Sequence, residues 1–156
     1  MARIRGTGGN DILRGTSHRD IIKGLGGHDA LIGKGGNDAL FGNDGNDVLH
    51  GGPGQDLLVG GRGKDWMWGG GGADVFRFAT GDGNFNPATG KGDIVWDYDD
   101  IRDYFDVPGS GLGSVYLSEV YNTPAGDGTY VRYSNFSGSF FVKDYFQIDW
   151  SNSDFI

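Results

Sequence analysis

The stretch GKGGNDALFGNDGNDVLHGGPGQD, residues 33–56, consists mostly of glycine, aspartate and asparagine. Such a composition is usual for a flexible or disordered linker. Yet the stretch holds an aspartate at every ninth position, and the same step continues in both directions along the chain. The members of this column are Asp11, Asp20, Asp29, Asp38, Asp47, Asp56, Asp65 and Asp74. Eight aspartates at a strict period of nine indicate a repeat architecture.

Two further columns keep the same period. A large apolar residue follows each aspartate by two positions: Leu13, Ile22, Leu31, Leu40, Leu49, Leu58, Met67 and Phe76. A glycine precedes each aspartate by five positions, from Gly6 to Gly69. We expect the last three residues of each unit to form a short strand whose apolar side chain points inward. The first six residues would form a turn, in which glycine supplies positive φ angles.

Stacking of these units would bring the aspartates close together. Successive strands are expected on opposite sheets, so units eighteen residues apart lie on the same side, about 4.8 Å from each other. Carboxylates at roughly that spacing repel one another. A Ca²⁺ ion between neighbouring turns would remove the repulsion, because it takes about six to eight oxygen ligands, including backbone carbonyls. The alternative is a metal-free solenoid in which the aspartates hydrogen-bond to the turns.

The three columns resemble the RTX (hemolysin-type calcium-binding) nonapeptide G-G-x-G-x-D-x-U-x, where U is a large apolar residue. GGPGQDLLV (51–59) and GGRGKDWMW (60–68) match it in full, whereas GTSHRDIIK (15–23) has His18 in place of the fourth-position glycine. The resemblance implies an all-β fold, a right-handed parallel β-roll followed by a small, mainly β carboxyl-terminal cap. We expect a calcium-binding roll over residues 1–78 and the cap over residues 79–156.

The same resemblance implies the calcium ligands. Each ion would take the aspartate of one turn, with the carbonyls of that turn's second and fourth residues. It would also take the aspartate eighteen residues on, with the carbonyls of the first and third residues of that turn. Eight units form six such pairs, which predicts about six ions, with a range of roughly five to eight. The carbonyl ligands are Thr7, Gly9, Gly24, Leu25, Gly26, Gly27, Gly33, Lys34, Gly35, Gly36, Gly42, Asn43, Asp44, Gly45, Gly51, Gly52, Pro53, Gly54, Gly60, Arg62, Gly69 and Gly71.

The second half of the chain resembles two families. GDIVWDYDDIRDYFDV (92–107) and the final FFVKDYFQIDWSNSDFI are similar to the end of serralysin-type secreted proteases. AGDGTYVRY (125–133) and GSFFVKDY (138–145) are similar to the tail of the R-modules of mannuronan C5-epimerases. Alternating runs such as SVYLSEVY predict strands of a cap over the end of the roll. Asp93 and Asp97 would either add one calcium site there or form an ordinary acidic surface.

The extreme carboxyl terminus resembles a type I secretion signal. By this resemblance Asp154, Phe155 and Ile156 carry part of the signal that an ABC exporter reads, so we expect a secreted, extracellular protein. The chain has no cysteine and no amino-terminal signal peptide, which agrees with that route. It also has no apolar run long enough for insertion into a membrane.

The sequence carries no recognisable catalytic motif. Its three histidines, at 18, 28 and 50, all fall in the repeats and do not form the zinc motif of serralysins. There is no G-x-S-x-G sequence and no phosphate-binding loop. We therefore expect a non-catalytic chain, either one module of a larger secreted enzyme such as an epimerase or metalloprotease, or a small free-standing protein.

Charge and aromatic residues suggest a second role. The formal charge is −8, which argues against nucleic acid as a partner. Six calcium ions would change it to a formal +4, which would attract an acidic polysaccharide such as alginate. Trp66 and Trp68 would stack on sugar rings, and Arg14 and Arg62 would meet carboxylates. The alternative is that the tail or a catalytic domain packs over the tryptophans.

Overall fold

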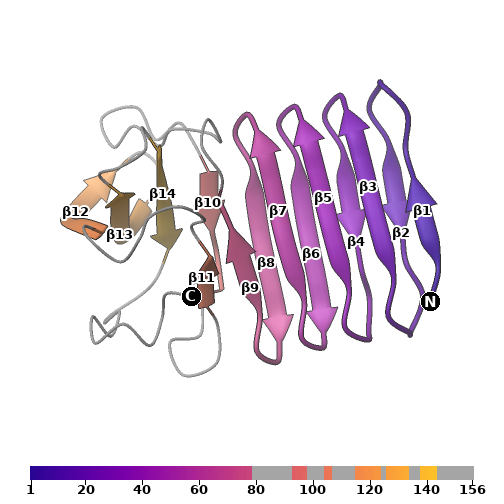
Figure 1. Cartoon of the computed structure of the whole chain (residues 1–156). Helices are drawn as coiled ribbons and strands as arrows, with labels where there is room; N and C mark the ends of the chain where they lie inside the picture. Colours follow the sequence, from indigo (N-terminus) through magenta and orange to yellow (C-terminus); the bar gives the residue numbers. More distant parts are fainter. Residues whose placement is uncertain (79–92, 98–103, 107–114, 124–125, 134–137, 144–156) are drawn as a thin grey trace.

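A computed structural model describes residues 1–78, 93–97, 104–106, 115–123, 126–133 and 138–143, the last three ranges by their backbone alone. Every regular element in these ranges is a β-strand. Consecutive strands of the repeats alternate between two sheets, so the chain winds into a roll that runs from the N-terminal end to the cap strands (Figure 1). None of the described residues forms a helix that would be long and apolar enough to cross a bilayer.

The first sheet has six parallel strands, and each strand pairs with the one eighteen residues further on while the repeat lasts. In spatial order the strands are β1 (Arg3–Arg5), β3 (Ile21–Gly26), β5 (Ala39–Asp44), β7 (Leu57–Arg62), β9 (Val75–Arg77) and β11 (Tyr104–Asp106). The register places each apolar column residue on the next, as in the pair of Ile22 with Leu40.

The second sheet has eight strands. Its parallel part is β2 (Ile12–Arg14), β4 (Ala30–Ile32), β6 (Val48–Pro53), β8 (Trp66–Gly71) and β10 (Asp93–Val95). Beyond β10 it continues through β14 (Gly138–Lys143), β13 (Gly126–Tyr133) and β12 (Val115–Thr123). β14 is parallel to β10, and β13 is antiparallel to both of its neighbours, β14 and β12. The cap strands therefore prolong one sheet of the roll. The expected all-β parallel roll is confirmed.

The strands of the roll are longer than the sequence predicts. β3, β5, β6, β7 and β8 each have six residues instead of three. Pairing with the neighbouring strand skips the first residue of a unit, such as Gly24, and then continues, so that Leu25 pairs with Asn43 and Gly26 with Asp44. Each of these strands thus continues through the third residue of the next unit, and only three residues, such as 45–47, separate it from the following strand.

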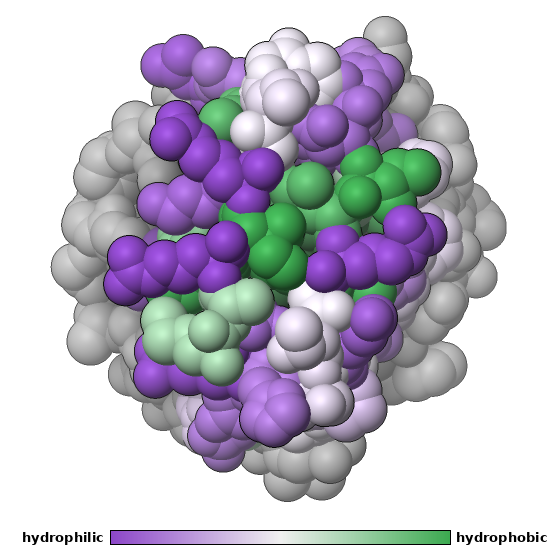
Figure 2. All heavy atoms as spheres, turned by 90° about the vertical axis from the view of Figure 1, so that its right-hand side faces the viewer, coloured by the Kyte–Doolittle hydropathy of each residue, from purple (hydrophilic) through white to green (hydrophobic). Residues whose placement is uncertain are grey.

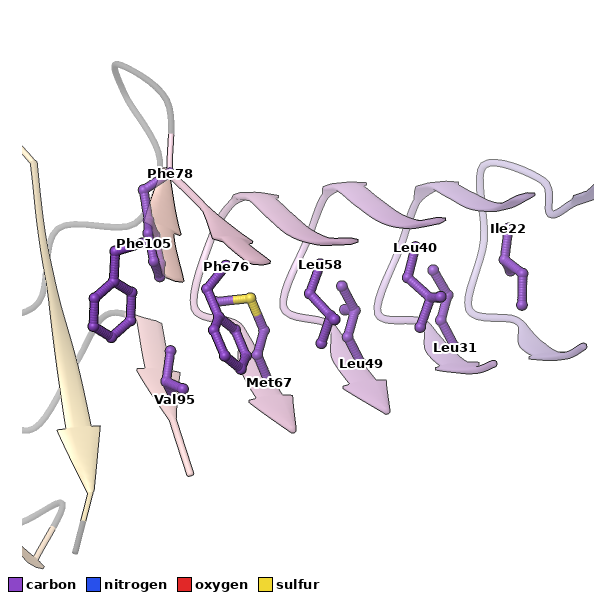
Figure 3. Packing of buried hydrophobic residues seen from close by; sticks show 10 residues of the cluster. All are labelled: Ile22, Leu31, Leu40, Leu49, Leu58, Met67, Phe76, Phe78, Val95 and Phe105. Carbon is purple, nitrogen blue, oxygen red and sulfur yellow. The ribbon is translucent and has the colours of Figure 1, made fainter. Parts of the chain in front are cut away.

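The core is one row of apolar side chains that runs along the roll between the two sheets (Figure 3). All the column residues from Ile22 to Phe76 are fully buried. Phe78, Val95 and Phe105 continue the row beyond the last nonapeptide, and Phe105 packs on both Phe76 and Phe78. One large apolar side chain per nine residues is little to set against the entropy lost by ordering the whole unit. The roll therefore needs another source of stability.

The roll begins one strand earlier and ends later than the repeat count suggests. Ile4 in β1 pairs with Ile22 and lies nine residues before Leu13, although Ala2 stands where the aspartate of this incomplete unit would be. At the other end β10 and β11 join the two sheets with Val95 and Phe105 in the apolar column. The sheets thus include strands from both sides of the boundary predicted after residue 78.

No described strand covers the N-terminal end of the roll. Apolar atoms occupy the centre of this end and hydrophilic residues surround them (Figure 2). Ile4 and Leu13 are only partly buried there, and Ile12 is 65% exposed. β1 and β2 are the terminal strands of the two sheets among the described residues, so the first turns have a neighbouring turn on one side only.

Candidate calcium sites

The repeat aspartates are buried. From Asp20 to Asp74 none is more than 3% exposed. Asp11, in the first turn, is only half-buried. Removal of a carboxylate from water is costly unless hydrogen bonds or a counter-ion replace the lost hydration. The hydrogen bonds that each buried carboxylate does and does not make therefore indicate whether its site could bind a cation.

From Asp29 to Asp74 one oxygen of each carboxylate is satisfied by the neighbouring turn. The Oδ1 atom accepts a hydrogen bond from the backbone N–H of the aspartate eighteen residues earlier, and in Asp20 it accepts from the N–H of Ala2 instead. On one edge Asp29 accepts from Asp11 at 2.8 Å and Asp47 accepts from Asp29 at 2.8 Å. On the other edge Asp56 accepts from Asp38 at 2.7 Å. The expected hydrogen bonding of aspartates to turns is thus present, but it uses one oxygen only.

The second oxygen is different. In Asp29, Asp38, Asp47 and Asp56 the Oδ2 atom is buried and has no hydrogen-bond partner. A buried acceptor without a partner, and still more a buried anionic one, strongly destabilises a fold. A cation beside Oδ2 would remove this cost.

Carbonyl oxygens of the adjacent turn lie next to these carboxylates. A Cβ built on Gly24 would overlap Asp29 Oδ2 and lie 2.9 Å from the carbonyl oxygen of Gly42. A Cβ on Gly45 would overlap the carbonyl oxygen of Gly27 and lie 3.5 Å from Asp47 Oδ1. The space between the two turns is therefore lined by oxygens from both, and the glycines keep it open.

The same arrangement recurs on the other edge. A Cβ on Gly33 would lie 2.5 Å from both Asp38 Oδ2 and the carbonyl oxygen of Gly51. Among the described residues, no three His, Asp or Glu side chains gather closely enough to hold a metal by themselves. A cation between turns would thus take many of its ligands from backbone carbonyls, as Ca²⁺ readily does. The donor set fits calcium.

The turn backbone is held in an unusual conformation. The second residue of six units has positive φ, including the non-glycine residues Leu25 (91°), Lys34 (84°) and Asn43 (78°). A left-handed conformation costs a residue with a side chain about 1–2 kcal/mol. The fourth residue also has positive φ, as in Gly45 (138°). Such strain persists only where other interactions hold it, and ligation of the carbonyls of these residues by a cation is one such interaction.

The electrostatics favour a bound cation in the middle of the roll. Burial raises the pKa of Asp47 and of Asp56 to about 6, although a backbone N–H opposes the shift in each case. Burial raises the pKa of Asp38 as well. By contrast, backbone N–H groups of Ala2 and Thr16 lower the pKa of Asp20. The carboxylates in mid-roll are thus the ones that most need a positive charge to stay ionised.

A second hydrogen-bond ladder runs beside the aspartates. Asn10 Oδ1 accepts the N–H of His28 at 2.7 Å, His28 Nδ1 accepts the N–H of Asn46 at 2.8 Å, and Asn46 Oδ1 accepts the N–H of Lys64 at 2.9 Å. These residues occupy the fifth position of their units, which the nonapeptide leaves unspecified. The three acceptor side chains, Asn10, His28 and Asn46, recur at that position as Asn or His, and this recurrence was the sequence signal that could have predicted the hydrogen bonds.

The predicted carbohydrate-binding residues do not form one compact cluster. Trp66 and Trp68 lie on β8, but Arg14 lies on β2, three strands away in the same sheet. Arg62 lies at the end of β7 in the other sheet, where it faces Asp44 at 3.9 Å.

The aromatic rings themselves form a stack that the sequence did not reveal. Trp68 lies between His50 and Trp96, with ring centroids 4.5 Å and 5.3 Å apart, so neighbouring rings cover both of its faces. Trp68 therefore has no free face for a sugar, contrary to its predicted role. Trp66 is 40% exposed, with Lys64 Nζ 5.5 Å from its ring centroid. Trp96 follows Val95 as Trp68 follows Met67, which was the available signal.

One residue from beyond the repeats does pack on the tryptophans in the part of the chain that the structure describes. Trp96 stacks on Trp68 and meets Trp66 edge-on, with ring centroids 6.4 Å apart in the second pair. β14 lies beside β10 within the same sheet, and Trp66 stays 40% exposed. The predicted packing of the tail over these rings is therefore found in part, at Trp68.

Asp93 behaves as a repeat aspartate. It is 1% exposed, and its Oδ1 accepts the N–H of Asp65 at 2.9 Å, so it is not part of an ordinary acidic surface. Asp97 accepts the N–H groups of Gly69 and Gly70 at 2.8 Å and 2.9 Å. A calcium site at these residues remains a prediction. The predicted secretion residues Asp154, Phe155 and Ile156 lie outside the described residues.

Comparison with known proteins agrees with the geometry. The sequence matches the RTX calcium-binding nonapeptide repeat in four overlapping copies, at residues 5–40, 24–58, 41–76 and 50–84. A search of curated proteins gave no match.

Several solved structures are similar. The AlgE6R3 subunit of the Azotobacter vinelandii mannuronan C5-epimerase is 29% identical, with a TM-score of 0.60, over 97% of this chain and 80% of that chain. The AlgE6R2 subunit of the same epimerase is 26% identical, with a TM-score of 0.56, over 98% of this chain and 91% of that chain. The extracellular lipase LipA from Serratia marcescens is 15% identical, with a TM-score of 0.48, over 99% of this chain and 40% of that chain.

Proposed function

The chain belongs to the RTX calcium-binding nonapeptide repeat family, and from this premise we propose that it is a non-catalytic module that folds when Ca²⁺ binds between its turns. The observation that carries the proposal is the set of buried, unpartnered Oδ2 atoms of Asp29, Asp38, Asp47 and Asp56. Each of them faces a turn whose carbonyl oxygens are close by. The bound ion would supply positive charge and bridge two turns.

The ligands of a representative ion can be named. In the site between Asp29 and Asp47, the two carboxylates would bind the ion together with the carbonyls of Gly27 and Gly42, and those of Leu25 and Asp44 would complete the set. The energy of metal binding would then become folding energy, because the site does not exist in the unfolded chain. This source of stability would make up for the thin core.

The direct test is titration of chelator-treated protein with Ca²⁺ in an isothermal calorimeter, with Mg²⁺ as the comparison. The proposal predicts binding of several calcium ions and much weaker binding of Mg²⁺, which requires a near-octahedral site and gives up its water reluctantly. A chain that binds no calcium, or that binds both ions alike, would contradict it.

We further propose that calcium dependence serves export. A module that stays unfolded where calcium is scarce and folds where calcium is plentiful could leave the cell through a type I ABC exporter and then fold outside. The carboxyl-terminal residues Asp154, Phe155 and Ile156 would carry part of the exporter signal. The module would then act in the extracellular space, alone or as part of a larger secreted enzyme.

A second candidate function is binding of an anionic polysaccharide, with alginate as the first ligand to test. Two observations favour it. The AlgE6 subunits of a mannuronan C5-epimerase are similar in structure. Trp66 is also an exposed aromatic ring beside a lysine. Bound calcium would add positive charge to the roll, which would attract uronate carboxylates.

The test is calorimetric titration of the calcium-loaded protein with defined alginate oligomers. Replacement Trp66→Ala should weaken binding about five- to tenfold, which corresponds to the loss of one aromatic contact. Ile12→Ala is the matched control, because Ile12 is exposed on the same sheet but lies on β2, far from the ring. Folded, calcium-loaded protein that gives no heat with alginate or other uronates would rule out this role.

A further inference from the structure

The first two turns satisfy their aspartates in a way that the later turns do not. In both of these turns the second residue is threonine. Thr7 donates its backbone N–H to Asp11 Oδ2 at 2.6 Å and its hydroxyl to the same atom at 2.9 Å. Thr16 donates the same two groups to Asp20 Oδ2 at 2.7 Å and 2.8 Å. The carboxylate oxygen that has no hydrogen-bond partner in mid-roll is therefore fully engaged here.

The threonine hydroxyl also closes the rest of the turn. Thr7 Oγ1 accepts the N–H of Gly9 at 3.2 Å, and Thr16 Oγ1 accepts the N–H of His18 at 3.2 Å. Each hydroxyl thus bridges the aspartate and the fourth residue of its unit. A cation bound at Oδ2 would have to displace this bridge.

The carbonyl of the threonine is also in use. Thr7 O accepts the N–H of Gly26 at 3.4 Å, and Thr16 O accepts the N–H of Gly35 at 3.3 Å. Later turns keep the same register in their longer strands, where Leu25 pairs with Asn43 and Gly26 with Asp44. This contact is therefore common to the roll, and the threonine hydroxyl is what sets the first two turns apart.

The backbone conformation differs in the same way. The second residue of each later unit has positive φ, as in Leu25, Lys34 and Asn43, and Thr7 and Thr16 are not among the positive-φ residues. Threonine is β-branched and avoids positive φ. The identity of this one residue therefore selects between two forms of the turn. One form is closed by a hydroxyl, and the other leaves a carboxylate oxygen exposed to the space between turns.

We propose that Thr7 and Thr16 close the first two turns without calcium, so that the calcium ladder begins at Asp29 and Asp38. The nonapeptide turns then hold four ions, and each ion lies between two aspartates eighteen residues apart. These sites are Asp29–Asp47, Asp38–Asp56, Asp47–Asp65 and Asp56–Asp74. The inference rests on the proposed calcium function and replaces the six sites that the repeat count predicts.

The position of these turns gives a reason for the arrangement. They lie at the N-terminal end, where Asp11 is only half-buried and has a neighbouring turn on one side (Figure 2). An ion at Asp11 would be closer to solvent and bound less firmly, whereas Asp20 is fully buried and its Oδ1 accepts the N–H of Ala2. Hydrogen bonds from threonine let the end of the roll keep its shape without an ion.

The experiment counts calcium ions per folded chain by native mass spectrometry and calorimetry. Thr7→Gly should bind one ion more than the wild type, because this turn then has glycine at both the second and the fourth position, as the turn of Gly52 and Gly54 has. Thr7→Ser keeps the hydroxyl and should bind the wild-type number. Thr16→Gly combined with His18→Gly should also gain one ion and provides a second, independent variant.

A pair of charge variants tests the wild-type ladder directly. Asp11→Asn should leave the ion count unchanged, whereas Asp29→Asn on the same edge should lower it by one. Loss of an ion in both variants, or no gain in either threonine-to-glycine variant, would overturn the inference while leaving the calcium function intact. A wild-type chain that binds no calcium would instead overturn the proposed function itself.

Discussion

Replacement of Asp47 by asparagine perturbs two proposed calcium sites at once. Asp47 Oδ2 faces the site shared with Asp65, and its Oδ1 faces the site shared with Asp29. Asparagine has the same shape and keeps an oxygen that can accept the Asp29 N–H, a bond of 2.8 Å in the native protein. The change therefore removes charge and one ligand oxygen and preserves the backbone ladder.

The expected loss follows from the two sites. An ion present at one hundred times its dissociation constant stabilises the folded state by about 2.7 kcal/mol. Loss of both ions would cost about 5 kcal/mol, a large part of the stability of a typical domain. For a chain of this size that corresponds to a fall in Tm of roughly 10–20 °C at fixed calcium. The Asp47→Asn protein should also need more calcium to fold and should bind two ions fewer.

The assay is thermal unfolding followed by circular dichroism at fixed calcium, with Asp44→Asn as the matched control. Asp44 carries the same charge three residues earlier in the same turn, but its side chain is 71% exposed and its ion pair among the described residues is with Arg62, at 3.9 Å. Such a pair contributes about 0–1 kcal/mol. Equal calcium requirement and equal Tm in the two variants would refute the role of the buried carboxylates.

Three further predictions follow from the same geometry. Burial raises the pKa of Asp47 and of Asp56 to about 6, above the usual value of about 4. Protonation of these two carboxyl groups therefore stabilises the calcium-free fold below about pH 4, and this stabilisation is lost as the pH rises through 6. Calcium requires the ionised form, so the calcium midpoint of folding should be higher at about pH 5.5 than at about pH 7.5, and an unchanged midpoint would contradict this. Gly42→Ala should raise the same midpoint several-fold, because its Cβ would overlap Asp47 Oδ2, whereas at Gly35 a Cβ meets only Pro53 O, at 3.8 Å, and Gly35→Ala should fold normally. Deletion of residues 150–156 should abolish export through a type I exporter and leave calcium binding by the roll intact, and secretion of the truncated chain at the normal level would exclude the signal.

The columns of the repeat could be predicted because each has a simple physical role. An apolar residue two positions after each aspartate must be buried once strands alternate between two sheets, and Leu31, Leu40 and Leu49 are fully buried. The eighteen-residue spacing of neighbouring aspartates also follows from that alternation, and it appears in every hydrogen bond between them within the repeats.

Other features depend on contacts that the period does not encode. The six-residue strands arise because pairing between strands skips one residue and then continues. This continuation depends on positive φ at residues such as Leu25 and Asn43, and a sequence position without glycine gives no sign of a positive φ. The closed first turns depend on whether a threonine hydroxyl reaches Asp11 or Asp20. The ring stack of His50, Trp68 and Trp96 joins residues from within and beyond the repeats, so no repeat pattern alone could reveal it.

The central claim is that calcium between the turns holds the roll together. Hydrogen exchange with and without a chelator tests it most directly, because the backbone amides of Asp29, Asp38 and Asp47 each donate to the aspartate of the next turn. The account predicts strong protection of these three amides in calcium. It predicts loss of that protection, together with the β-type circular dichroism, when calcium is removed, and a cooperative return when it is restored. Amides that stay equally protected in excess chelator would contradict it.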